Sequence, residues 1–116
     1  MTTHCLIADD SRMSRMMIKK IISQAHPDWS IVEAEDGQAA VDQANEHEFQ
    51  VVLLDFNMPV MNGGQAAEHI RKLYPQAKIA FLTANVQDSI KNLAINLGID
   101  FIAKPISEIK INDYIG

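Results

Sequence analysis

Short apolar runs alternate along the chain with longer segments in which apolar residues recur at helical spacing. The runs span residues 5–8, 31–32, 51–54, 79–82 and 101–103, and polar or turn-forming residues follow each of them. Such runs are typical of strands that are covered on both faces. Strands that alternate with helices are joined by right-handed crossovers, so the pattern predicts one parallel sheet with helices on both sides.

Helices are predicted in the segments between these runs. They are expected after Ser11 up to residue 25, over about 38–46, from the loop at 62–64 to residue 73, through the apolar stripe at 90–97, and over about 107–115. Ser11 can cap the first helix, and Gly98 ends the fourth in the manner of a left-handed C-terminal cap. The methionines of the first helix, Met13, Met16 and Met17, are expected to fill the core at its start.

Composition limits the classes of protein to which the chain can belong. With 116 residues, 47% hydrophobic and 22% charged, we expect a single globular domain over residues 1–116. The net charge of -5 and the lack of a basic tract argue against direct nucleic-acid binding. No apolar run approaches the roughly 20 residues of a membrane span. The single cysteine, Cys5, lies in an apolar run, which favours a buried residue in a reducing cytoplasm.

Chemically useful side chains stand where the predicted strands end. Asp9 and Asp10 follow the first run, Asp55 ends the third, Thr83 ends the fourth, and Lys104 ends the fifth. The carboxyl ends of parallel strands share one edge, where open α/β sheets place their sites. Each residue alone has a simpler interpretation, such as a solvated turn or a cap. One shared site accounts for all of them together and predicts chemistry for a divalent metal and a phosphoryl group.

With these motifs in this order, the sequence resembles a response-regulator receiver domain over essentially the whole chain. The compact length and the Asp9-Asp10-Ser11 start look most like the stand-alone, chemotaxis-type (CheY-like) receivers. The resemblance implies an α/β, flavodoxin-like (βα)5 fold: a doubly wound parallel five-stranded sheet in the order 2-1-3-4-5, with helices on both faces. It also implies a phosphorylation-activated signalling switch of a two-component system, not an enzyme acting on a separate substrate.

In that family pattern Asp55 is the phosphoacceptor. It would take a phosphoryl group from a phosphohistidine of a histidine kinase or phosphotransfer protein, or from a small acyl phosphate. A carboxylate is ionised at pH 7 and attacks without a general base. Lys104 would bind one phosphoryl oxygen, and Thr83 would stabilise another.

The resemblance also implies Mg²⁺ at the acidic cluster. Three carboxylates at about 4 Å would repel by about 4 kcal/mol per pair at an effective dielectric near 20, so a cation must occupy the site. Asp10 and Asp55 would ligate the metal through carboxylates, Asn57 through its backbone carbonyl, and Asp9 directly or through water. Mg²⁺ suits such oxygen donors.

For the output, the resemblance implies a switch made by Thr83 and Phe101. Thr83 would move toward the phosphoryl group, and Phe101 would turn into the space left behind, with the small Ala84 leaving room. An equally open interpretation is that Phe101 is a buried core aromatic. The responsive surface would be the fourth helix, fifth strand and last helix, residues 86–97 and 101–115, which would bind an unknown downstream protein.

Several alternatives remain at this point. A Mg²⁺-dependent phosphatase with an aspartyl nucleophile would need a proton-shuttling acid near Asp55, but Asn57 and Asn85 are both neutral. In the receiver family these two positions tune hydrolysis of the phosphoaspartate. A flavin binder is disfavoured because Asp9 and Asp10 would repel a phosphate. The chain could also be a phosphorelay intermediate or a receiver excised from a larger regulator. We expect a monomer, with phosphorylation-linked pairing as an alternative.

Overall fold

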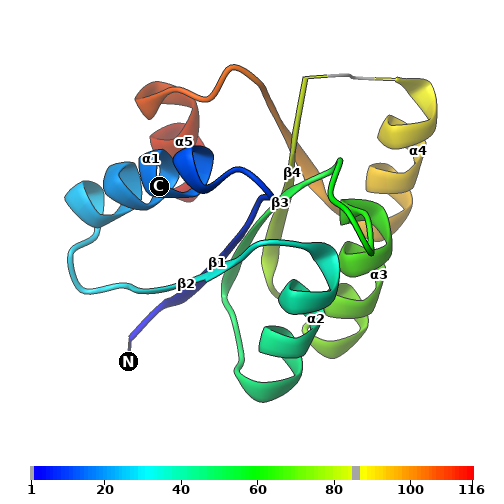
Figure 1. Cartoon of the computed structure of the whole chain (residues 1–116), viewed down its shortest axis with the longest axis horizontal. Coiled ribbons are helices and arrows are strands. Elements are labelled where there is room, and N and C mark those ends of the chain that lie inside the picture. Colours follow the sequence, from blue (N-terminus) through cyan, green and yellow to red (C-terminus); the bar gives the residue numbers. More distant parts are fainter. Residues whose placement is uncertain (1, 85–86) are drawn as a thin grey trace.

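The five predicted strands form one parallel sheet in the order β2-β1-β3-β4-β5. A computed structural model describes residues 2–84 and 87–116, and Figure 1 shows the twisted sheet with helices on both faces. The strands are β1 (His4–Ala8), β2 (Ser30–Ala34), β3 (Val51–Asp55), β4 (Lys78–Thr83) and β5 (Asp100–Ala103). The predicted strand order and fold class are confirmed.

The first four helices connect consecutive strands and α5 follows the last strand, and local residues fix where the helices begin and end. They are α1 (Arg12–Ala25), α2 (Gly37–Glu46), α3 (Gly63–Leu73), α4 (Asp88–Leu97) and α5 (Glu108–Ile115). The Ser11 side chain accepts from Ser14 N–H at the start of α1, and Gly98 ends α4 with φ 66°, as predicted. Within the described parts of the chain, no helix combines the length and apolarity needed to cross a bilayer.

Two hydrophobic cores lie on opposite faces of the sheet. Helices α1 and α5 cover one face and α2, α3 and α4 cover the other (Figure 1). The central strand β3 is buried at all five positions, which explains why its sequence is uniformly apolar up to Asp55. Because β3 is packed along its whole length, Asp55 at its end is held in a fixed position.

The methionines of α1 are exposed, so the prediction that they fill the core is wrong. Met13 is 81% exposed, Met16 58% and Met17 42%. Ile18 and Ile22, one helical turn apart, supply the buried stripe that packs on the sheet. Met13, Met16 and Met17 lie on the other side of α1, because a helical period of about 3.6 residues places them away from Ile18 and Ile22.

Strand register brings the predicted site residues to one edge. Ala8 pairs with Leu54 and Asp55 with Leu82, so β1, β3 and β4 end at nearly the same level. Thr83 pairs with Ala103, which places Lys104 just beyond the end of β5. The residues that follow these strands therefore share the carboxyl edge of the sheet, as expected.

Candidate functional site

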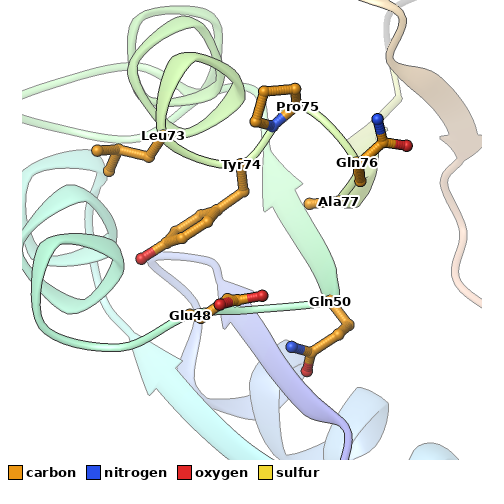
Figure 2. Close-up of a pocket in the computed structure, with 7 residues that line it drawn as sticks. All are labelled: Glu48, Gln50, Leu73, Tyr74, Pro75, Gln76 and Ala77. Carbon is orange, nitrogen blue, oxygen red and sulfur yellow. The ribbon is translucent and has the colours of Figure 1, made fainter.

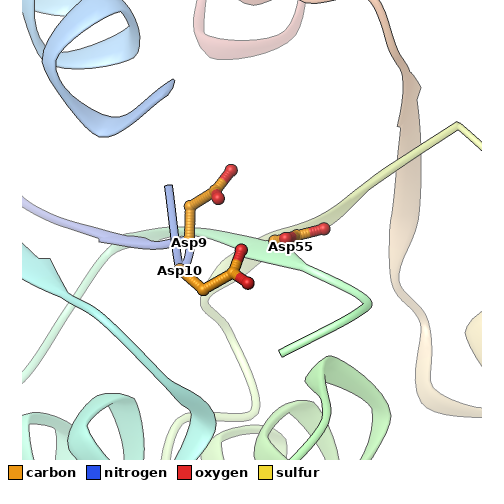
Figure 3. A group of neighbouring side chains, drawn as sticks. All are labelled: Asp9, Asp10 and Asp55. Carbon is orange, nitrogen blue, oxygen red and sulfur yellow. The ribbon is translucent and has the colours of Figure 1, made fainter. Parts of the chain in front are cut away.

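Three carboxylates converge at the carboxyl edge of the sheet. Asp9 and Asp10 leave the end of β1, and Asp55 ends the neighbouring strand β3 (Figure 3). One carboxylate oxygen from each lies within 4.8 Å of the others. Asp9 is fully buried and Asp55 is 5% exposed, whereas Asp10 is exposed to solvent. The cluster is therefore buried at Asp9 and Asp55 and open to solvent at Asp10.

Lys104 faces this cluster from the loop after β5. Its Nζ donates to Asp55 Oδ1 at 3.3 Å and lies 3.7 Å from Asp9 Oδ2. The Lys104 side chain is 28% exposed, so its ammonium remains reachable from solvent. Its backbone N–H donates to Thr83 O at 2.9 Å, which ties the loop to the end of β4. One ammonium therefore pairs with two of the three acids.

Burial makes the two inner carboxyls weaker acids. Desolvation, followed by the neighbouring charge of Asp9, raises the pKa of Asp55 to about 6, although Lys104 acts in the opposite direction. Desolvation likewise raises the pKa of Asp9, against the Ser11 N–H bond and the Lys104 charge. One ammonium does not fully compensate the negative charge gathered here.

The donor set at this cluster fits a hard divalent cation. Asp9 Oδ1 accepts from Ser11 N–H at 2.8 Å, but the buried Asp9 Oδ2 has no hydrogen-bond partner in the described structure. A buried carboxylate oxygen without a partner is costly unless a cation or water meets it. Three clustered carboxylates that keep an open side suit Mg²⁺, which takes oxygen ligands and retains waters.

The remaining predicted residues lie around the same edge. Asn57 is exposed, and its backbone N–H points at Asp55 Oδ1 at 3.4 Å. Thr83 is buried at the end of β4, and Ala84 beyond it is exposed. Asn85, predicted to tune hydrolysis, lies outside the described residues. The structure thus brings Asn57, Thr83 and Ala84 to the edge that carries the acids.

Phe101 is half-buried. The sequence left open whether it is a switch residue that turns inward or a buried core aromatic, and half-burial lies between an exposed and a fully buried ring. It stands in β5 at the end of an aromatic row, 6.2 Å from the Phe81 ring, and Phe81 lies 5.3 Å from the Phe56 ring. Phe101 also lines a hollow of about 380 Å³ between β5 and α5. Its ring therefore touches both the core and the outer face.

Sequence reasoning missed Arg15, whose side chain supports the loop that carries Asp9 and Asp10. Its guanidinium donates to the backbone carbonyl of Asp9 at 2.5 Å and to Glu33 Oε1 on β2 at 3.2 Å. The side chain is only 13% exposed. The available signal was a basic residue three positions before Ile18, on the buried side of α1, where an apolar residue would be usual.

A separate hollow of about 350 Å³ lies at the opposite, amino-terminal edge of the sheet (Figure 2). It is formed between the residues before β3, Glu48 and Gln50, and the turn after α3. The Tyr74 hydroxyl there lies within hydrogen-bond distance of the backbone carbonyls of Ala44 and His47, and its single proton can be donated to either of them. None of the predicted site residues that the structure describes lines this hollow.

The family model of the response regulator receiver domain matches residues 5–116. The chain belongs to this receiver family. It is 38% identical over 107 residues to the chemotaxis protein CheY of Thermotoga maritima, covering 91% of this chain and 88% of that protein. The family resemblance drawn from the strand-end motifs is therefore confirmed.

Solved structures support the same assignment. Vibrio cholerae CheY4 superposes with a TM-score of 0.89 at 25% identity, covering 99% of this receiver and 97% of that chain. The CheX-CheY-BeF3-Mg complex of Borrelia burgdorferi gives 0.88 at 25% identity, covering 97% and 86%. Related receivers also occur in enzymes: a protein-glutamate methylesterase of Methanosarcina acetivorans is 40% identical over 110 residues, which are 92% of this chain and 31% of that protein.

Proposed function

We propose that this receiver is a phosphorylation-activated switch of a two-component system and that Asp55 is its phosphoacceptor. The observation that carries the proposal is the placement of Asp55: buried at the end of β3, 3.3 Å from Lys104 and clustered with Asp9 and Asp10. We further propose that residues 1–116 act as one receiver unit in the cytoplasm. The phosphoryl donor is a histidine kinase or phosphotransfer protein, or a small acyl phosphate.

In the proposed reaction a carboxylate oxygen of Asp55 attacks the donor phosphorus. The new bond joins Asp55 to phosphorus, the bond between phosphorus and the donor nitrogen or oxygen breaks, and the donor leaves with the bonding electrons. With a pKa of about 6, Asp55 is mostly ionised at pH 7 and needs no base. Lys104 is released from the Asp55 carboxylate and binds a phosphoryl oxygen, while the Thr83 hydroxyl binds another.

Mg²⁺ is the cofactor that we propose for this step. Asp10 and Asp55 would hold it through carboxylates and Asn57 through its backbone carbonyl, with Asp9 acting directly or through water. When bound, the ion neutralises charge on the phosphoryl oxygens and the acids. The buried Asp9 Oδ2, which accepts no hydrogen bond from the described residues, and the open side of the cluster support this ligand set.

For the output, we propose that Thr83 and Phe101 change position together. The half-buried Phe101 has the hollow between β5 and α5 on one side and Phe81 on the other, so either direction offers it contacts. The exposed Ala84 leaves space beside Thr83. The responsive face is then α4, β5 and α5, which binds the downstream protein, and the receiver acts as a monomer without direct contact to nucleic acid.

A phosphatase with an aspartyl nucleophile is the second candidate function. It would need an acid and base two residues after Asp55, but the exposed residue there is Asn57, whose amide cannot act as a general acid or base at neutral pH. We therefore propose slow dephosphorylation. Multiple turnover on an added phosphomonoester would contradict this and favour the phosphatase.

Beryllofluoride with Mg²⁺, a mimic of the bound phosphoryl group, tests the switch. Backbone amide NMR spectra recorded with and without it should shift at Thr83, Phe101 and residues of α4 and α5, and Asp55→Asn should abolish these shifts. Pull-downs under the same two conditions should then recover a partner only in the activated state. Shifts confined to the acidic cluster would contradict a responsive α4-β5-α5 face and indicate a passive phosphate carrier.

A further inference from the structure

The loop that carries Lys104 has few backbone donors of its own. Lys104 N–H donates to Thr83 O, but Pro105 has no N–H to contribute. The carbonyls on either side of Lys104 instead meet a side chain: Lys110 Nζ donates to Ala103 O at 2.9 Å and to Pro105 O at 3.1 Å. A single ammonium thus bridges the backbone before and after Lys104.

Lys110 is itself anchored close to this loop. It lies in the first turn of α5, and its backbone N–H donates to the Ser107 hydroxyl at 3.2 Å, which caps the helix. An ammonium has three donors, so two carbonyls can be held at once with one donor left for solvent. The bridge therefore connects a helix end to the carbonyls of the two residues that flank Lys104.

We propose that Lys110 is a positioning residue for phosphoryl transfer, because its ammonium holds the Ala103 and Pro105 carbonyls and so keeps Lys104 directed at Asp55. The inference deepens the proposed function and rests on it. The Lys104 Nζ contact to Asp55 is already at 3.3 Å, near the outer limit of a hydrogen bond. A loop shift of less than 1 Å would break this contact. The hydrogen bonds that hold the loop therefore also maintain the contact between Lys104 and Asp55.

The same bridge connects the site with the proposed partner face. Lys110 lines the hollow between β5 and α5 together with Phe101, Asp113 and Tyr114. A carboxylate presented there by a partner would compete with the two carbonyls for the Lys110 ammonium. Partner binding and the position of Lys104 would then be coupled, and the coupling would act in both directions.

Amide hydrogen exchange tests the bridge without any phosphoryl donor. In Lys110→Met, which keeps an unbranched stem but no ammonium, exchange of the Lys104 N–H should be about three- to tenfold faster. Lys110→Arg should restore most of the protection. Lys72→Met is the matched control, since Lys72 is an exposed lysine of α3 whose ammonium lies 3.7 Å from Glu68. Equal exchange in Lys110→Met and the wild type would overturn the proposal.

A double-mutant cycle separates positioning from simple loss of stability. At saturating Mg²⁺ and well below the melting temperature, Lys110→Met should slow phosphorylation by acetyl phosphate about three- to tenfold without changing Mg²⁺ affinity. In a Lys104→Ala background it should have no further effect, because Lys110 acts through Lys104. An equal slowing in both backgrounds would overturn the proposal. If the wild type accepts no phosphoryl group, the proposed function fails, and the exchange experiment still decides the role of Lys110.

Discussion

Gly37 lies directly against the backbone of Met61. A Cβ at position 37 would stand 1.9 Å from the Met61 carbonyl oxygen and 2.6 Å from its carbon. Gly37 is the first residue of α2, whereas Met61 belongs to the loop that follows Asp55 and precedes α3. The start of α2 therefore supports the loop that carries the proposed Asn57 ligand.

Gly37→Ala should destabilise the receiver and disturb its metal site. No side-chain motion relieves a contact with backbone, so the loop must move, and we expect the free energy of unfolding to fall by about 1–3 kcal/mol. Urea denaturation measures this loss, and Mg²⁺ affinity should weaken with it. Gln38→Ala, at the exposed neighbouring position, should change little. Equal stability of Gly37→Ala and the wild type would contradict the close approach.

Val60 adopts a conformation that β-branched residues rarely accept. Its φ is 70°, and Met61 N–H donates to Pro59 O across it at 2.7 Å, which forms a γ-turn of the strained, positive-φ kind. The side chain is 82% exposed, so little packing compensates the strain. The strained turn lies in the loop between Asp55 and α3.

Val60→Gly should therefore stabilise the protein. Relief of about 1–3 kcal/mol of backbone strain should exceed the roughly 0.5–1 kcal/mol that glycine costs in chain entropy. Thermal melting of Val60→Gly and Val60→Ala measures the difference, because alanine keeps the strain and should gain much less. A lower melting temperature for the glycine variant would count against a strained turn.

The response to Mg²⁺ should depend on pH. Folding raises the Asp55 pKa from 3.8 to about 6, so between these values the folded chain retains a proton that the unfolded chain has lost. For this group, metal-free stability falls as pH rises from about 4 to 6, by at most about 3 kcal/mol. Mg²⁺ opposes that loss because it competes with the proton.

Thermal melts at about pH 5 and pH 7.5 test this linkage. Stabilisation by Mg²⁺ should be larger at the higher pH, where Asp55 is ionised without the metal. Asp10→Asn should remove most of the effect. A Mg²⁺ shift that is the same at both pH values, or that survives Asp10→Asn undiminished, would be incompatible with the proposed ligands.

Lys104→Ala should separate metal binding from phosphoryl transfer. The ammonium contacts Asp55 and Asp9 but contributes no metal ligand, so Mg²⁺ should still bind, and more tightly once a competing cation is removed. Phosphorylation by acetyl phosphate should slow by about 10²-fold or more, as expected for a removed charge-stabilising donor. Titration with Mg²⁺ and a phosphorylation time course give the two readings. Loss of both activities together would indicate a mainly structural lysine.

The sheet and the acidic cluster could be predicted because the sequence marks them locally. Asp9, Asp55 and Lys104 each follow a buried apolar run, and parallel strands bring such ends together. Contacts made by side chains across elements leave no such pattern. The support of Asp9 by Arg15, and of the Lys104 loop by Lys110, depends on where helices lie against loops, which periodicity does not fix.

The methionines of α1 were wrongly predicted to be buried. At about 100° per residue, Met13, Met16 and Met17 lie on the side of α1 opposite Ile18 and Ile22. The apolar character of the methionines, and not their spacing, led to the prediction. Hydrophobic composition therefore overestimated the width of the buried face.

The most direct measurement is the intact mass of the protein after incubation with acetyl phosphate and Mg²⁺, followed by peptide mapping. The wild type should gain one phosphoryl group, located on Asp55, and Asp55→Asn should gain none. An undiminished gain in Asp55→Asn, or a phosphoryl group mapped to another residue, would contradict the assignment of Asp55 as the phosphoacceptor.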